Sequence, residues 1–102
     1  MTDFKQMLET DRLIHEPARL IIMALLYGVD NADFTFLLTE TGLTRGNLSF
    51  HLTKLEEAGY VAIEKTYKGK RPYTLCSLTE NGRLAFDTYR LQLQQTANSL
   101  PD

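Results

Sequence analysis

Two groups of side chains in the second half of the chain have the types and spacing needed to bind an anionic, hydrogen-bonding ligand. The first group is spaced along one predicted helix and consists of Thr44, Arg45, Asn47, Ser49 and Lys54. The second group surrounds a glycine and consists of Lys68, Lys70 and Arg71. One arginine can donate two hydrogen bonds to a guanine, and one asparagine can donate a hydrogen bond to an adenine and accept another from it. Lysine and arginine also bind phosphate. The two groups therefore favour recognition of nucleic acid over catalysis.

The helix that carries the first group has one apolar and one polar face. At about 100° per residue, Leu48, Leu52 and Leu55 fall on one side and are expected to face a core. Phe50 falls on the opposite side, where its ring is expected to be exposed. Three interpretations of Phe50 stay open from sequence: contact with a thymine methyl group, contact with a protein partner, or a local rotation of the helix.

Signals at its ends place this helix over residues 44–58. Thr44 is a favoured N-cap, and Gly59 is a favoured terminator. A shorter helix is expected before it over residues 34–42. The connection over residues 41–44 is short and contains glycine, which is the helix-turn-helix pattern. In that motif the second helix is the one that enters the DNA major groove.

Two strands joined by a basic turn follow this helix. Residues 60–67 and 72–78 are the strands, and residues 68–71 are the turn, in which Gly69 can supply a positive φ. One face of the first strand carries Val61, Ile63 and Lys65. A helix-turn-helix followed by such a hairpin is a winged helix, in which the hairpin lies on phosphates beside the occupied groove.

The expected fold is mainly α with a two- or three-stranded β wing, in the order α-α-α-α-β-β-α. A chain of 102 residues that is 43% hydrophobic can bury one modest core, so a single domain over residues 1–102 is expected. The remaining expected elements are a short helix over 3–11, a central core helix over 17–27, a polar turn over 30–33, a cap at Thr35, a last helix over 79–95 capped by Thr79, and a frayed tail over 97–102.

The net charge of −2 hides a segregation of charge along the chain. Residues 44–76 hold six basic and three acidic side chains, a local charge of +3. Residues 1–43 carry −4 and residues 77–102 carry −1. Because salt screens charges beyond about 10 Å, a docked duplex responds to the local charge more than to the total. Overall acidity is therefore compatible with DNA binding.

Other classes of function have little support. The longest apolar run, residues 20–27, is too short to span a bilayer, and the polar N-terminus does not resemble a secretory signal, so a cytoplasmic location is expected. A single cysteine and two histidines on separate elements predict no catalytic, metal or cofactor site. Cys76 is expected to be a small buried hydrophobe.

Three segments resemble the winged-helix transcriptional regulators of the MarR and ArsR type. NLSFHLTKLEEAGYV, within residues 44–61, is similar to their recognition helix. EPARLIIMALL resembles their first core helix, and KTYKGKRPYTLCSLTENG resembles their wing and the start of the next helix. The resemblance covers about residues 15–90 and is strongest to a small subgroup that is little more than the winged helix plus terminal helices.

The resemblance implies a homodimer that binds a pseudo-palindromic operator in double-stranded DNA. The implied DNA-binding residues are Thr44, Arg45, Asn47, Ser49, Phe50 and Lys54 in the recognition helix, and Lys68, Lys70 and Arg71 in the wing. His51 occupies a position where the family often has histidine, and is interpreted as structural or phosphate-contacting. The chain lacks the cysteine pair of metal-sensing ArsR proteins and the long terminal helices of typical MarR proteins, so the effector stays unknown.

The terminal helices are the expected dimer interface. Phe86, Tyr89 and Leu93 form an apolar stripe on the last helix, which Leu84, Ala85 and Leu91 widen beyond the need of a small core. The leading hypothesis is therefore a dimeric, sequence-specific DNA-binding regulator. The alternative is a winged-helix protein-interaction module that uses the same surface with Phe50 as an anchor.

Overall fold

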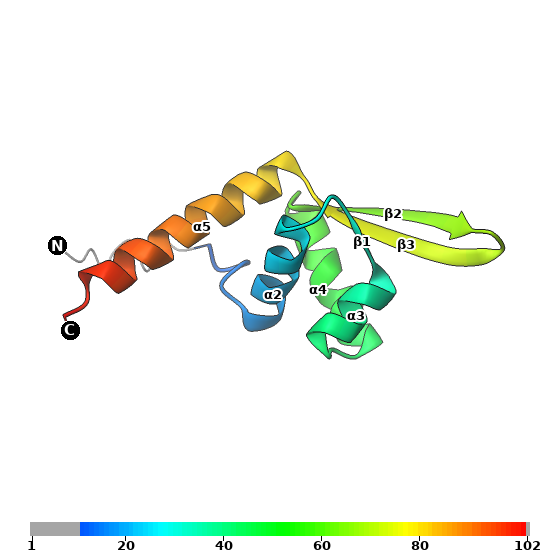
Figure 1. Ribbon diagram of the computed structural model, residues 1–102, viewed down its shortest axis with the longest axis horizontal. Coiled ribbons are helices and arrows are strands. Elements are labelled where there is room, and N and C mark those ends of the chain that lie inside the picture. Colours follow the sequence, from blue (N-terminus) through cyan, green and yellow to red (C-terminus); the bar gives the residue numbers. More distant parts are fainter. Residues whose placement is uncertain (1–10, 102) are drawn as a thin grey trace.

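The computed structural model describes residues 11–101, and four helices and three strands lie in this range (Figure 1). The helices are α2 (Pro17–Tyr27), α3 (Phe34–Thr41), α4 (Arg45–Glu57) and α5 (Glu80–Ser99). The strands are β1 (Ala32–Asp33), β2 (Val61–Lys68) and β3 (Arg71–Leu78). The helix expected over residues 3–11 lies outside the described residues, apart from Asp11. No helix within the described range is long and apolar enough to cross a membrane.

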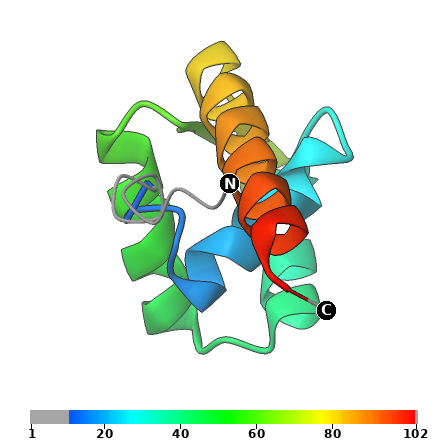
Figure 2. The same ribbon diagram turned by 90° about the vertical axis from the view of Figure 1, so that its left-hand side faces the viewer.

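The central element is α2, which lies between α3 and α4 when the molecule is viewed from the free end of α5 (Figure 2). The β2–β3 hairpin projects from one side of this helical body, and α5 projects from the other (Figure 1). The predicted recognition helix α4 and the hairpin are therefore neighbours, while most of α5 points away from them.

The sheet is antiparallel and has the order β1-β3-β2. The hairpin pairs along its whole length, from Val61 opposite Leu78 to Lys68 opposite Arg71. Residues 30–33 were expected to be only a polar turn, but Ala32 and Asp33 form β1 and pair with β3. A two-residue strand is too short to show the alternation that identifies strands in sequence. The wing sheet is thus the three-stranded form.

Helix caps agree with the sequence at most ends. The hydroxyl of Thr44 accepts from the N–H of Asn47 at 3.1 Å. The hydroxyl of Thr79 accepts from the N–H of Gly82 at 2.9 Å. The cap expected at Thr35 is wrong, because Asp33 is the N-cap of α3 and its carboxylate accepts from the N–H of Phe36 at 2.6 Å.

The last helix is longer than its sequence signals indicate. It was expected to end near residue 95 with a frayed tail from 97, but α5 continues to Ser99. The residues after Leu93 are mostly polar and show no helical repeat of apolar side chains, so the sequence does not mark them as helix. Their backbone nevertheless continues the helix to Ser99.

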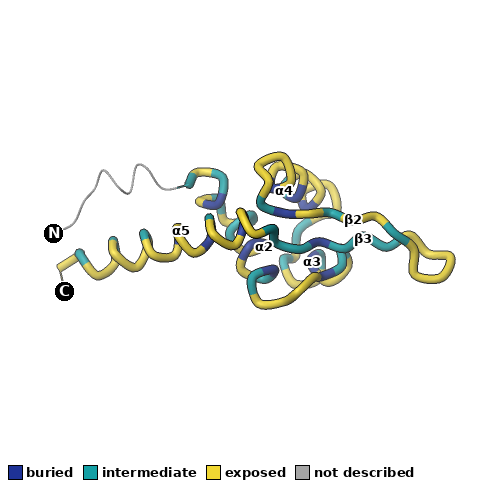
Figure 3. The backbone as a smooth tube through the Cα atoms, turned by 90° about the horizontal axis from the view of Figure 1, so that it is seen from above, coloured by how far each residue is buried: buried dark blue, intermediate teal, exposed yellow. Residues whose placement is uncertain are grey.

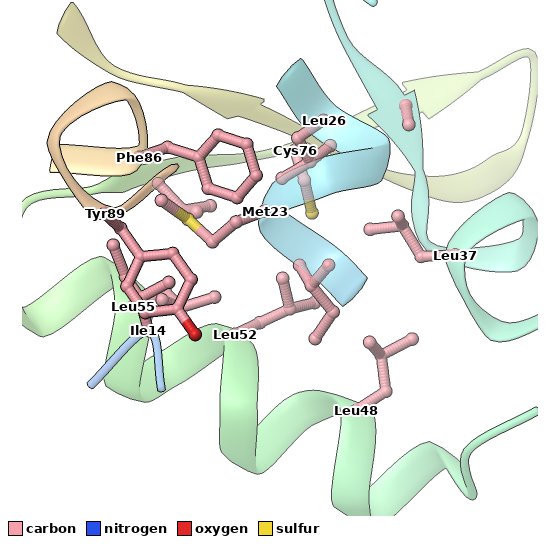
Figure 4. Packing of buried hydrophobic residues seen from close by; sticks show 13 residues of the cluster. Ile14, Met23, Leu26, Leu37, Leu48, Leu52, Leu55, Cys76, Phe86 and Tyr89 are labelled. Carbon is pink, nitrogen blue, oxygen red and sulfur yellow. The ribbon is translucent and has the colours of Figure 1, made fainter. Parts of the chain in front are cut away.

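The hydrophobic core lies where α2, α4, α5 and the sheet meet (Figure 4). Leu48, Leu52 and Leu55 of α4 are buried, as the helical wheel predicts. The fully buried residues also include Ile14, Ile22, Met23, Leu26, Leu37 and Cys76. Because the apolar side of α4 is anchored in this way, its polar side is forced outward.

The first turn of α5 is clamped to the start of β2. The Thr79 hydroxyl donates to the carbonyl of Gly59 at 2.5 Å, and the Thr79 N–H donates to the carbonyl of Tyr60 at 3.0 Å. Gly82 passes so close that an added Cβ would lie 2.1 Å from the Tyr60 carbonyl oxygen. This contact requires glycine at position 82 and fixes where α5 leaves the sheet.

Only the first half of α5 belongs to the core. Phe86 and Tyr89 are buried, but no described residue of the helix beyond Tyr89 is buried, and Leu84, Leu91 and Leu93 are exposed (Figure 3). The predicted apolar residues are therefore divided by helix face as well as along the helix: Phe86 and Tyr89 enter the core, whereas Leu84 and Leu91 lie on the opposite side and face solvent.

Candidate nucleic-acid interface

The N-terminal part of α4 is presented to solvent by the tight turn before it. Gly42 ends α3 with φ of 69°, a left-handed conformation that favours glycine, and Thr44 then caps α4. Every residue that the sequence predicts as a DNA contact on this helix is exposed: Thr44, Arg45, Asn47, Ser49, Phe50 and Lys54. The exposed set covers the end and the sides of α4 that the buried leucines leave free, which is the arrangement needed for insertion into a groove.

Arg45 and Asn47 lie on different sides of α4. The guanidinium carbon of Arg45 is 5.9 Å from the centre of the Phe34 ring, so its charge lies over the start of α3. Two residues further along, Asn47 is rotated by about 200° around the helix. The two predicted base-reading side chains therefore flank the helix rather than stand side by side.

A groove separates α4 from the inner face of the wing. It has a volume of about 720 Å³ and is lined by Phe34, Arg45, Ser49, Leu52, Thr53, Glu56, Ile63, Lys65 and Thr74. Donor side chains come from both walls, with Arg45 and Ser49 on the helix and Lys65 on the sheet. Glu56 is the acidic residue of the lining.

Lys65, Thr53 and Thr74 were not predicted as site residues. The signal for Lys65 was present in the alternation of β2, which puts it on the same face as Val61 and Ile63. Since that face carries core residues further in, its outward continuation must face α4. Thr74 follows from the register alone, because it pairs with Lys65.

The wing ends in a two-residue turn that exposes its cations. Lys68 pairs with Arg71, so Gly69 and Lys70 form the turn. Gly69 has φ of 66°, whereas no described residue other than glycine has a positive φ, which is the pattern of a type II′ hairpin. Lys68, Lys70 and Arg71 are all exposed, and the ammonium of Lys68 lies 5.5 Å from the Tyr73 ring centre.

A second hollow lies between the wing and the start of α3. It has a volume of about 550 Å³. Its lining includes the three cationic residues Arg45, Lys68 and Arg71. Arg45 therefore borders both concave surfaces and links the recognition helix to the wing.

Phe50 is exposed over 54% of its surface. Lys54 places its ammonium 5.6 Å from the Phe50 ring centre, and the His51 ring meets it edge-on at 5.3 Å between centres. The exposure of Phe50, with Leu48, Leu52 and Leu55 buried as the helical wheel predicts, excludes the local helix rotation considered from sequence. Contact with a thymine methyl group and contact with a protein partner both remain compatible with this position.

His51 connects α4 to the start of α2. Its Nδ1 lies 3.1 Å from a terminal nitrogen of Arg19 and 3.6 Å from a carboxylate oxygen of Glu16. Burial opposes the ionisation of Glu16, but hydrogen bonds from the N–H groups of Arg19 and Ala18, with the charges of His51 and Arg19, leave its pKa lowered. His51 is therefore at the edge of the packed face, where it joins two helices.

Cys76 is buried in β3. Burial, followed by the carboxylates of Glu56 and Asp33, raises the pKa of its thiol to about 11. Because the thiolate is the reactive form, this environment suits an inert core residue. The sequence prediction of a buried hydrophobe is confirmed.

Comparison with known proteins identifies relatives of this arrangement. The profile of a family described as "Winged helix DNA-binding domain" matches residues 18–97. An uncharacterised protein of Methanocaldococcus jannaschii is 36% identical over 89 residues, which cover 87% of this chain and 97% of that protein.

Solved structures share the fold over nearly the whole chain. A transcriptional regulator homologue from Pyrococcus horikoshii OT3 has a TM-score of 0.87 and 27% identity. The match covers 95% of this chain and 96% of the Pyrococcus horikoshii chain. A structure from Enterococcus faecalis V583, named for the MarR family of transcriptional regulators, has a TM-score of 0.76 and 18% identity. The match covers 96% of this chain and 88% of the Enterococcus faecalis chain. At that identity the second likeness concerns the fold alone.

Proposed function

This chain belongs to the winged helix DNA-binding domain family, and we propose that it is a transcriptional regulator that binds one double-stranded operator sequence as a homodimer. The observation that carries the proposal is the position of the exposed face of α4 beside the basic wing, with a donor-lined groove between them. The family is defined by DNA binding rather than by an enzymatic reaction.

In the proposed complex α4 enters the major groove with its N-terminal half leading. The major groove is about 12 Å wide and accepts one α-helix. Arg45, Asn47 and Ser49 then act on base edges or on the adjacent phosphates, while Thr44 and Lys54 bind the backbone. Support for this orientation comes from the burial of Leu48 and Leu55, which leaves no other face of α4 free.

The wing cations are proposed to bind phosphates without reading sequence. Lys68, Lys70 and Arg71 project from the hairpin tip, and no carboxylate lies within residues 65–72. Each phosphate neutralised releases condensed counterions, so this contribution to affinity depends on salt. The wing would thus fix the register of α4 in the groove.

The exposed apolar side of α5 is proposed as the dimer interface. Leu84, Leu91 and Leu93 are solvent-exposed on a helix that projects away from the DNA-facing side (Figure 1). Leu84 and Leu91 lie on one side of the helix, about 180° around from Leu93. In the proposed dimer a two-fold axis beside this helix buries Leu84 and Leu91 and puts two copies of α4 on the same face of a duplex. The two half-sites would then be about 34–36 Å apart, one helical turn.

The test is selection of a binding sequence from random duplexes, followed by titration of the selected duplex and a scrambled duplex at one salt concentration. The proposal expects a pseudo-palindrome and at least about a thousandfold preference for it. Equal affinity for the two duplexes would contradict sequence-specific regulation.

One competing function is favoured by a specific observation, the exposed Phe50 ring. Exposed aromatic residues are frequent anchors of protein interfaces. A winged-helix interaction module would bind neither duplex, and Phe50→Ala would abolish binding to its protein partner. The titration above distinguishes this candidate from the DNA-binding regulator.

A further inference from the structure

Tyr67 is an exposed aromatic residue near the tip of the wing. Its exposed fraction of 71% is the largest among the large hydrophobic residues that the structure describes as exposed. Its side chain makes no hydrogen bond or ring contact with any described residue. A tyrosine in such a position has neither a packing role nor a polar partner within residues 11–101. Its surface is free for a ligand.

The strand register gives the direction in which Tyr67 points. Paired residues of an antiparallel ladder share a face, and Tyr67 pairs with Pro72. The same face carries the Ile63–Cys76 pair at the core and the Lys65–Thr74 pair in the groove beside α4. Tyr67 therefore continues the face of the wing that is turned toward the recognition helix.

The wing carries Tyr67 well beyond α4. Tyr67 is four residues beyond Ile63, which lines the groove beside α4, so it lies roughly 14 Å further out at the usual rise of a strand. The major groove that α4 would occupy is about 12 Å wide. A side chain that far beyond a residue beside α4 reaches past half of this width, to the phosphate ridge that separates the major groove from the minor groove.

The charge around Tyr67 fits the same ligand. Lys65 lies on the same face as Tyr67 and Lys70 lies at the turn, whereas Lys68 and Arg71 pair with each other on the opposite face. No carboxylate lies among these residues in sequence. The sugar–phosphate backbone offers an anionic oxygen beside the apolar edge of a deoxyribose. A phenol ring with a terminal hydroxyl complements both parts, whereas the neighbouring cations complement only the charge.

We infer that Tyr67 contacts the DNA backbone at the edge of the minor groove next to the major groove that α4 occupies. Its ring packs against a deoxyribose, and its hydroxyl donates to a phosphate oxygen. This inference rests on the proposed function and extends it, because it assigns to the wing an uncharged contact in addition to its phosphate-binding cations.

The experiment compares Tyr67→Ala, Tyr67→Phe and the control Thr66→Ala on the selected operator. Thr66 is the neighbouring residue of β2, and its side chain lies on the opposite face of the wing. We expect Tyr67→Ala to weaken binding about tenfold and Tyr67→Phe to weaken it by a smaller factor, since the ring is kept and one hydrogen bond is lost. Thr66→Ala should stay within about twofold of the wild type.

Two further readouts separate a contact from a general disturbance of the wing. The slope of log affinity against log salt should be unchanged in Tyr67→Ala, because no cation is removed. Hydroxyl-radical footprinting, which reports on exposed deoxyribose, should show loss of protection at the wing position only. Thermal unfolding should match the wild type, since the side chain is exposed.

The outcomes distinguish this inference from the function on which it rests. If the wild type binds its operator and Tyr67→Ala binds within twofold with an unchanged footprint, the assignment of Tyr67 is wrong and the regulator remains. If the wild type selects no sequence and binds no duplex, the proposed function fails, and the Tyr67 contact fails with it.

Discussion

At the scale of single residues, the exposed face of α4 divides into side chains that can read bases and side chains that can only bind phosphate. Asn47 and Arg45 flank this helix on different sides. They would therefore contact different base pairs. Lys70 lies at the hairpin turn, away from base edges.

The first prediction follows from this division. Asn47→Ala and Arg45→Ala should each reduce discrimination against a substituted base pair by about 1–3 kcal/mol. Lys70→Ala should instead weaken binding to specific and random duplexes by the same factor. The measurement is fluorescence anisotropy on the operator, its single-base variants and a scrambled duplex. Equal losses on all duplexes for Asn47→Ala and Arg45→Ala would refute base reading by α4.

A second prediction concerns Cys76. Burial raises its thiol pKa to about 11, so the fraction of reactive thiolate in the folded protein is very small near neutral pH. Alkylation by iodoacetamide should be slow in the native protein and fast in denaturant, and its native rate should rise as pH approaches 11. Mass spectrometry against time gives both rates. Rapid native labelling at pH 7 would indicate an accessible thiolate and reopen a redox role.

At the scale of elements, the junction between α5 and β2 determines how the wing and the last helix are held together. Gly82 packs directly against the backbone of Tyr60, and the Thr79 hydroxyl bonds the carbonyl of Gly59. Neither partner can move aside by changing rotamer, because both are main chain. The junction is therefore sensitive to one added carbon atom.

The third prediction is that Gly82→Ala destabilises the fold by about 1–3 kcal/mol, the usual cost of overpacking. Gly46→Ala is the matched control, since a Cβ there meets nothing within 4 Å. Because alanine favours helix, that control should stabilise by about 0.5–1 kcal/mol. Urea unfolding monitored by circular dichroism measures both. A neutral Gly82→Ala would contradict the tight junction.

The elements differ in how far the sequence predicts them. Helix α4 was predicted closely because Leu48, Leu52 and Leu55 repeat at helical spacing between a clear cap and a glycine. The hairpin was predicted from Gly69 in the turn and from the alternation of apolar and polar side chains in the strand before it. Strand β1 was missed because it depends on pairing with β3, a contact distant in sequence. The Asp33 cap is local, since its carboxylate accepts from the N–H of Phe36, and it was missed because Thr35 was chosen as the cap in its place. The role of Gly82 likewise exists only once Tyr60 is beside it.

The candidate site was predicted only in part, because some of its residues are identified by local spacing and others only by contacts between elements distant in sequence. Side chains on α4 and at the hairpin turn are exposed as their periodicity indicates. The face of Lys65 could be inferred from the alternation of β2, but its position opposite α4 could not, and Thr74 was identified only by the sheet register. Local pattern predicts which face of an element is polar, but not which neighbouring element that face meets.

The fourth prediction concerns α5 as the proposed dimer interface. Leu91→Glu should convert the protein to a monomer and weaken operator binding, because a carboxylate would be buried against the partner helix. Gln94→Glu adds the same charge at an exposed polar position of the helix and should leave the dimer intact. Light scattering at micromolar concentration gives the mass. A wild-type monomer under these conditions would contradict the dimer.

At the scale of the whole molecule, charge is separated along the chain between a basic segment and two acidic flanking segments. The segment 44–76 carries +3 within a chain of net charge −2. A duplex that docks on α4 and the wing meets the basic segment, whereas the flanking segments would repel it. This separation favours one docking orientation without requiring a basic protein.

The fifth prediction follows from this separation. Affinity for the operator should fall steeply as salt rises, and Lys70→Ala should reduce the slope of log affinity against log salt by about 1 per protomer. Asn47→Ala should leave the slope unchanged. Titrations at several salt concentrations provide the slopes. A salt-independent affinity would be inconsistent with phosphate contacts by the wing.

The pairing of the hairpin limits how the wing can vary in length during evolution. Lys68 pairs with Arg71 across a two-residue turn, and side chains alternate between the two faces from there inward. Inserting one residue into a strand would transfer every outer side chain to the opposite face. Wings of different length that keep this function should therefore differ by two residues in each strand, and single insertions should survive only where a bulge absorbs them.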